Sequence, residues 1–447
     1  MQHFIKALAA AVVLGATLGH AAVTPEEVRQ LGTSLTETGA EKSGNREGTI
    51  PAYTGGLTKP PAGFKQGSGI RPNPFADEKP KFSIDAKNMA QYAAQLSEGS
   101  QSLLQKYPSY RIDVYPTHRT VAYPKFVTDN TVKNAGKAKT TNEGRSITGA
   151  HAAIPFPIPK DGYEVMWNHL LHFNGRMVVS KYRNVNVDAS GRATVASEGI
   201  AELDYPYWDT ERVSDVYSRT RVRYSGPARR AGEALLLVDP LNSGAQDRRG
   251  WGYLPGQRRV RLAPDYAHDT PNPGTAGATT FDDTFVFNGS MDRFNFKLLG
   301  KKEMFVPYNA YAAVYQTRQD DLFKPNHLNP DVLRWELHRV WVVEATLREG
   351  KRHVYSKRRF YINEDSWGAV LSDEFDARGK IYRAGFALQA PSYDQPAPAD
   401  GVWGAYDLAT GVYTVGGYAA ETGGLTYAKP LSEREWTADA LAGTGVR

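Results

Sequence analysis

Apolar and polar residues alternate along most of the second half of the chain. The stretch RRGWGYLPGQRRVRLAPDY, residues 248–266, shows this clearly, because apolar residues stand at alternate positions on both sides of a Pro-Gly corner. These apolar residues are Trp251, Tyr253, Val260 and Leu262. A period of two is typical of a strand with one dry and one wet face. Since Pro255 and Gly256 suit the central positions of a type II turn, we expect a hairpin that turns at 254–257.

The same alternation recurs in a series of segments that short turns connect. We expect strands over 177–187, 192–203, 216–224, 234–238, 292–300, 334–347, 354–362, 367–375 and 381–388. Strands that follow one another through short turns pair as an antiparallel sheet. The sequence therefore predicts one large antiparallel sheet.

Helical patterns are fewer and lie mostly before the strands. Thr24 and Glu27 form a capping box, with Pro25 at the first helical position, which predicts a short helix. A longer helix is expected over 85–106 and a short one over 161–173, and a last one over 432–441 begins with another capping box. The fold class is therefore α+β, with one large antiparallel sheet and a few helices.

The first residues have the three parts of a secretory signal. Lys6 precedes the apolar run ALAAAVVLGATLG, which is too short to span a bilayer, and the small residues of GHAAV follow it. We expect residues 1–21 to be a cleaved signal peptide and 22–447 to be a single domain in the periplasm. The first part of this domain, about 22–82, is rich in Gly and Pro and lacks periodicity, which predicts an arm that wraps the domain.

The composition removes several classes of function. The 447 residues include no cysteine, which excludes disulfides, thiolate metal sites and a lipidated cysteine. The formal net charge is +6, and the basic residues are scattered rather than gathered in a tract, so we expect no nucleic-acid partner. No cofactor and no metal are expected, and the sequence leaves the oligomeric state open.

Catalytic motifs with known mechanics are missing. The chain has no G-x-S-x-G elbow, no Walker A loop and no H-E-x-x-H pair. His268, between Asp265 and Asp269, is the strongest candidate for acid–base chemistry, but a loop that caps its own backbone is the preferred interpretation. The acidic pairs 282–283 and 364–365 are interpreted as turn chemistry in the same way.

Aromatic residues are the most informative part of the composition. The chain carries 8 Trp, 25 Tyr and 17 Phe, several of them at alternate positions of the expected strands. Aromatic stripes are usually core, and loops such as 39–80 could complete such a core. However, the expected helices are too few to cover so many apolar strand faces, which favours an open concave space that holds an apolar ligand. The residues expected to line it are Trp251, Tyr253, Phe294, Phe296, Trp335, Leu337, Arg339, Trp341 and Val343. Arg339 is the one charge on its strand face, and we expect it either to meet an anionic head group or to reach water at the rim.

Several motifs resemble one family of uncharacterised proteobacterial proteins. In order, they are GAEKSGNREGTIPAYTGGL, VYPTHRT, IPFPIPKDGYEVMWNHL, GWGYLPGQRRVRLAPDY, GKKEMFVPYN, ELHRVWVVEATL and YINEDSW. The family is described as outer-membrane lipoprotein-sorting-like. The resemblance implies the half-open barrel of the lipoprotein carriers LolA and LolB, in which a large curved antiparallel sheet is closed by a few helices around an apolar cavity. It also implies a resistance-nodulation-division type exporter and an outer-membrane protein as partners. No catalytic residue comes with the resemblance, and the chain departs from LolB in having no lipidated cysteine.

Two functions from different classes follow. The first is a periplasmic carrier or chaperone that binds a hydrophobic, lipid-like ligand and hands it between an inner-membrane exporter and the outer membrane. The second is a hydrolase of an envelope lipid or polymer that uses His268 with Asp265 or Asp269. The missing catalytic motifs favour the carrier.

Overall fold

The computed structural model describes residues 23–243, 247–263, 266–398 and 401–444. The expected signal peptide, residues 1–21, lies outside this part. Among the described residues, no helix has the length and apolar character needed to cross a bilayer.

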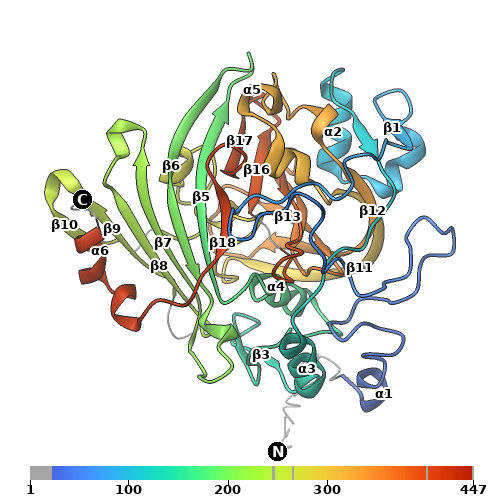
Figure 1. The fold of residues 1–447 in the computed structure, drawn as a ribbon, viewed down its shortest axis with the longest axis horizontal. Helices are drawn as coiled ribbons and strands as arrows, with labels where there is room; N and C mark the ends of the chain where they lie inside the picture. Colours follow the sequence, from blue (N-terminus) through green and yellow to red (C-terminus); the bar gives the residue numbers. More distant parts are fainter. Residues whose placement is uncertain (1–22, 244–246, 264–265, 399–400, 445–447) are drawn as a thin grey trace, which may run out of the picture.

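One large sheet dominates the molecule (Figure 1). Its strands are β1 (Phe82–Ile84), β2 (Ile112–Val114), β5 (Met177–Val187), β6 (Ala193–Asp204), β7 (Val216–Gly226), β8 (Ala234–Pro240), β9 (Arg249–Leu254), β10 (Arg259–Leu262), β11 (Phe294–Pro307), β12 (Trp335–Leu347), β13 (Lys357–Asn363), β14 (Ala369–Phe375), β15 (Ile381–Leu388), β16 (Val402–Asp407), β17 (Tyr413–Tyr418) and β18 (Gly424–Tyr427). Two further strands, β3 (Lys139–Thr141) and β4 (Ser146–Thr148), form a separate pair.

The sheet joins the two halves of the chain. Its spatial order is β1-β2-β12-β13-β14-β15-β16-β17-β5-β6-β7-β8-β9-β10, with β11 beside β12 and β18 beside β5. The pairings are antiparallel except for a single parallel bridge between β2 and β12. In Figure 1 the green strands β5–β10 fan out on one side, and the orange and red strands lie on the other. The outer strands β1 and β10 do not pair with each other, so the sheet stays open.

Few helices accompany the sheet. They are α1 (Pro25–Val28), α2 (Glu98–Lys106), α3 (Lys125–Asn134), α4 (Gly162–Leu170), α5 (Gln319–Leu322) and α6 (Ala438–Thr444). Figure 1 shows α3 and α4 at one end of the molecule, while α6 packs outside β8, β9 and β10. The α+β class and the large curved sheet predicted from the sequence are confirmed.

Besides the capping box of α1, which Thr24 and Glu27 form as expected, local signals placed two more helix starts correctly. Asp161 caps α4, because its carboxylate accepts the amide of Glu164 at 2.8 Å. Ser432 and Glu435 form the expected capping box, but the helix expected over 432–441 is divided at the extended Thr437 into a 3-10 turn, Glu433–Trp436, and α6. In both cases a short polar side chain satisfies amides that the first helical turn leaves free.

Two further local predictions are wrong. The helix expected over 85–106 is split into a 3-10 segment, Met89–Gln95, and α2, because Ser97 leaves the helix and caps α2 through the amide of Ser100 at 3.0 Å. The type II turn is also wrong. The hairpin pairs Leu254 with Arg259, and its loop is a 3-10 turn that ends in Arg258, whose φ is 45°.

The arm, residues 23–82, crosses the surface of the domain and is held by side chains spaced along it. The buried guanidinium of Arg71 donates to Asp394 at 2.6 Å, and the Phe75 ring stacks on His118 at 4.2 Å between ring centroids. The carboxylate of Glu41 accepts from Lys301 at 2.7 Å. These contacts fix the arm at three separate places. The expectation that residues 22–447 form a single domain stays a prediction.

Candidate functional site

A pocket of about 180 Å³ lies over one face of strands β5–β8. Its floor is made of alternate residues, which all point to the same side of a sheet. They are Val178, Ser180, Tyr182, Asn184, Ala201, Leu203, Ser218, Thr220, Val222, Tyr224, Leu235 and Leu237. The floor is therefore mainly apolar, with a few hydroxyl and amide groups.

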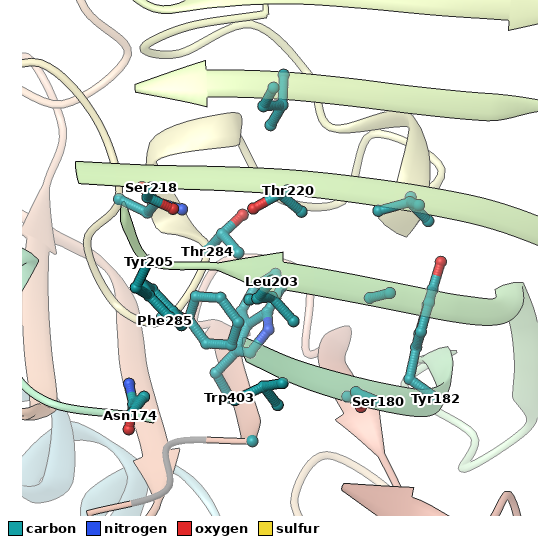
Figure 2. Close-up of a pocket in the computed structure, with 18 of the residues that line it drawn as sticks. Asn174, Ser180, Tyr182, Leu203, Tyr205, Ser218, Thr220, Thr284, Phe285 and Trp403 are labelled. Atoms are coloured by element: carbon teal, nitrogen blue, oxygen red, sulfur yellow. The ribbon is translucent and has the colours of Figure 1, made fainter. Parts of the chain in front are cut away.

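The segment between β10 and β11 forms the roof of the pocket, and we call its described part, residues 266–293, the roof. Phe281, Thr284, Phe285 and Phe287 of the roof line the pocket. Figure 2 shows Thr284 facing Thr220 across the pocket and Phe285 beside Trp403 of β16. The rings of Phe285 and Trp403 meet edge to face, with 6.2 Å between their centroids.

The roof carries backbone strain where it covers the pocket. Phe285 and Val286 have φ values of 54° and 72°, in the left-handed region. Such values are unfavourable for residues other than glycine and most of all for a β-branched one, and they persist only where the surroundings hold the chain. The roof therefore needs a strong anchor close to Phe285.

A buried ionic cluster provides this anchor, and we call it the roof anchor: Asp282, Asp283, His353, Tyr355, Arg358 and Arg383. Arg358 donates to Asp282 and to Asp283 at 3.1 Å each, and to the carbonyl of Val286 at 3.1 Å. His353 Nε2 lies 3.0 Å from Asp282 Oδ2, and the Tyr355 hydroxyl donates to Asp283 at 2.9 Å. The two roof carboxylates, interpreted from the sequence as turn chemistry, are thus bound to Arg358 of β13, to Arg383 of β15 and to the segment before β13.

Electrostatics in the roof anchor depend on burial and on Arg358. Burial alone would raise the pKa of Asp282, but the charge of Arg358 and the hydrogen bond with His353 outweigh it and lower this pKa. Glu374 is also buried and lies 3.7 Å from Arg358. There burial dominates and raises the pKa of Glu374 to about 8. Asp282 is therefore charged at neutral pH, whereas Glu374 is mostly protonated.

We expect Glu374 to make the protein less stable as the pH rises from about 5 to 8. Its pKa is about 8 in the folded state against an ordinary value of 4.5, so the folded state binds the extra proton in this interval. The contribution of Glu374 to the free energy of unfolding is fully present below pH 4.5, its ordinary pKa, and is lost as the pH rises through its folded-state pKa of about 8. Glu374→Gln should flatten the slope of unfolding free energy against pH, measured by urea titration. An unchanged slope would contradict the assignment.

The polar end of the pocket contains a buried arginine. Arg248 Nε donates to Asp239 at 2.6 Å, and Nη2 donates to Asn288 of the roof at 2.7 Å. Nη1 is buried and has no hydrogen-bond partner within the described part of the chain. Arg248 lines this pocket and also a much smaller void of about 20 Å³ beside Ser290. A buried donor without a partner costs free energy, so a ligand oxygen that accepts from Nη1 would stabilise the complex.

The structure places all nine residues predicted from the sequence outside the wall of this pocket. Trp251 and Tyr253 lie on the opposite face of the sheet, because Trp251 pairs with Leu236, and Leu236 points away from Leu235 and Leu237. There they pack with Trp436 and Leu441, beneath α6. The buried apolar face of the hairpin is thus covered by the C-terminal helix α6.

The other apolar candidates belong to filled cores. Phe294, Phe296, Trp341 and Val343 pack with α4 and with Phe287 of the roof. Trp335 and Leu337 belong to a second core cluster that includes residues of α2. Arg339 lies 3.5–3.6 Å from Glu41, Glu303 and Glu364, so its charge is balanced within the protein. Loops and α4 therefore fill the space over β11–β13 that was expected to be open.

The residues of the candidate acid–base site are bound by neighbouring side chains. His268 Nε2 lies 3.3 Å from Asp292 Oδ1, and burial lowers the pKa of His268. Asp269 is bound by Arg293 at 2.6 Å, and Asp265 lies outside the described residues. Glu364 and Asp365 face Arg119, which donates to Asp365 at 2.6 Å. Among the described residues, no group of three or more acidic or histidine side chains is placed to hold a metal ion.

Part of the pocket carried a signal in the sequence. The strands of its floor were predicted, but their pocket-facing residues mix Val and Leu with Ser, Thr and Asn, so no apolar stripe marks them. The roof lies in a segment without periodicity. Strands β16–β18, which supply Trp403, Leu425 and Tyr427, were not predicted at all.

Comparison with known proteins identifies the family. Residues 83–442 match the family model described as "Protein of unknown function (DUF1329)". The chain belongs to this family. An uncharacterized protein of Pseudomonas aeruginosa is 38% identical over 445 residues, 98% of this chain and 97% of that protein. The family predicted from the sequence motifs is therefore confirmed.

Several solved structures match this DUF1329 protein at low sequence identity. A domain from Vibrio parahaemolyticus, described in terms of outer membrane lipoprotein sorting, matches with a TM-score of 0.44 and 13% identity, over 63% of this chain and 98% of that one. A DUF1329 family protein from Desulfovibrio piger matches with a TM-score of 0.43 and 15% identity, over 63% and 97%. A LolA superfamily protein from Nitrosomonas europaea has a TM-score of 0.38 and 11% identity, over 63% and 99%.

Proposed function

We propose that this protein is a periplasmic carrier that binds a hydrophobic ligand between β5–β8 and the roof. The observation that carries the proposal is the pocket of about 180 Å³, with its largely aliphatic and aromatic wall. An engineered apolar cavity of about 150 Å³ holds benzene, so this pocket has room for a ring or a short acyl segment. No residue of the arm lines it, so the arm leaves the space free.

The polar end of the pocket narrows the class of ligand. Asp239 already balances the charge of Arg248, so the free Nη1 suits an oxygen acceptor that need not carry a full charge. A carboxylic acid, an ester or an amide group on an apolar body has this chemistry. The ligand we propose is therefore amphiphilic, with its oxygen at Arg248 and its apolar part between Leu203 and Phe285.

The proposed location and route follow from the sequence. The expected signal peptide, residues 1–21, supports export to the periplasm. Transfer of the ligand between a resistance-nodulation-division type exporter and the outer membrane stays a prediction, because it depends on the family resemblance alone.

Native mass spectrometry of protein purified from its own periplasm tests the proposal. We expect a population with added mass, which organic extraction removes and identifies as an amphiphilic compound. The same protein after extraction should bind a fluorescent acyl probe. Protein that carries no added mass and binds no apolar probe would contradict the carrier function.

A further inference from the structure

The hairpin of β9 and β10 carries an unusual set of exposed side chains at the end of the sheet. Arg249, Arg258, Arg259 and Arg261 are all exposed. None of the four makes an ion pair with another described residue. Within thirteen residues the hairpin therefore presents four positive charges to solvent.

Exposed apolar side chains stand beside these charges. Leu262 is 61% exposed and Leu254 is 39% exposed. Trp251 is half-buried, with the guanidinium of Arg249 5.6 Å from the centre of its ring. Leucine at this level of exposure is unfavourable in water unless another surface covers it.

The hairpin is placed so that a broad surface can reach it. β10 is the last strand of the sheet and pairs only with β9 in the described chain. The register places Arg259 and Arg261 on the face of Leu254, and Leu262 on the face of Trp251 and α6. Figure 1 shows the hairpin at the outer end of the green strands, beside α6.

We propose that the β9–β10 hairpin docks the protein on an anionic phospholipid membrane. Arginines bind lipid phosphates, and adjacent leucine and tryptophan side chains enter the interfacial layer, which is the combination that interfacial binding requires. Charge on an edge strand also protects it from pairing with other strands. That protection accounts for the arginines of β10, but not for the two exposed leucines or for Arg249 and Arg258.

Vesicle sedimentation of the mature chain tests the proposal. The wild type should bind vesicles of phosphatidylcholine with about one third phosphatidylglycerol, should not bind pure phosphatidylcholine, and should dissociate as salt is raised. Arg259→Gln together with Arg261→Gln should weaken binding roughly tenfold to thirtyfold. Leu262→Ser should weaken it roughly threefold, with little change in the dependence on salt.

Two arginines elsewhere on the surface serve as a control that distinguishes an effect of the hairpin from an effect of net charge. Arg192 and Arg378 are exposed in the turns between β5 and β6 and between β14 and β15, so Arg192→Gln with Arg378→Gln removes the same charge elsewhere. This control should bind vesicles like the wild type. An equal loss of vesicle binding in the control would overturn the proposal. Failure of the wild type to bind anionic vesicles at low salt would also overturn it, and an acidic protein would then be the better partner. Binding of an acyl probe should be unchanged in every variant. A negative result with vesicles would therefore contradict the membrane proposal without contradicting the carrier function.

Discussion

Arg358→Met is expected to lower the free energy of unfolding by about 3–5 kcal/mol, because it leaves Asp282 and Asp283 as buried carboxylates without their main cation. Arg358 is fully buried, so water does not take over its role. The same substitution removes the bond to the carbonyl of Val286, next to the strained Phe285. We therefore expect the affinity for an acyl probe to fall as well, because the roof loses its anchor. Urea unfolding and probe titration measure the two effects.

The next residue in the same strand is the control. Arg359 points to the other side of β13 and binds Glu98 and Glu344 near the surface, at 2.6 and 2.8 Å. Surface ion pairs contribute little, so Arg359→Met should cost less than about 1 kcal/mol and leave the affinity unchanged. Equal losses in the two variants would show that the roof anchor has no special role.

Thr220→Trp is expected to abolish binding of an acyl probe. Thr220 lies in the floor of the pocket and faces Thr284 of the roof, as Figure 2 shows. An indole ring there would occupy much of a space of about 180 Å³. Ligand and indole would compete for the same volume, so the affinity should fall by at least roughly a hundredfold, as expected when most of the apolar contact is lost. Fluorescence titration measures the affinity.

Thr194→Trp is the matched control, because Thr194 is an exposed residue of β6. It should bind the probe like the wild type. If Thr220→Trp fails to fold, Ser180→Phe, on the neighbouring part of the floor, makes the same test with a smaller ring. Full affinity in a folded Thr220→Trp protein would mean that the ligand binds elsewhere.

The carrier and membrane proposals concern different parts of one sheet. The pocket uses one face of β5–β8, whereas the hairpin of β9 and β10 extends the same sheet beyond the pocket. Leu235 and Leu237 line the pocket, and their partners Gly252 and Gly250 leave space that Tyr266 of the roof fills. The roof therefore packs against the root of the hairpin. A membrane-bound hairpin would place the roof close to the lipid surface.

Elements with local signals could be predicted from the sequence. Period-two alternation marked β5 as Met177–Val187 without error, and capping residues such as Asp161 and Ser432 marked two helix starts. Each depends on residues within a few positions of one another: a strand needs one buried face, and a helix start needs an acceptor for its free amides. The motifs spread along the chain likewise determined the family.

Which apolar face is open depends on contacts between segments that are distant in the chain. The alternation of Trp251 and Tyr253 shows that one face is buried, but the register against Leu236 decides that α6 covers it. The pocket lies on the other face, where Ser180 and Thr220 interrupt the apolar pattern. Its roof is held by Arg358, which is more than seventy residues from Asp282 and Asp283 in the chain. A local pattern records that a side chain leaves water, whereas the surface that receives it depends on pairings between distant segments, which no short stretch of sequence contains.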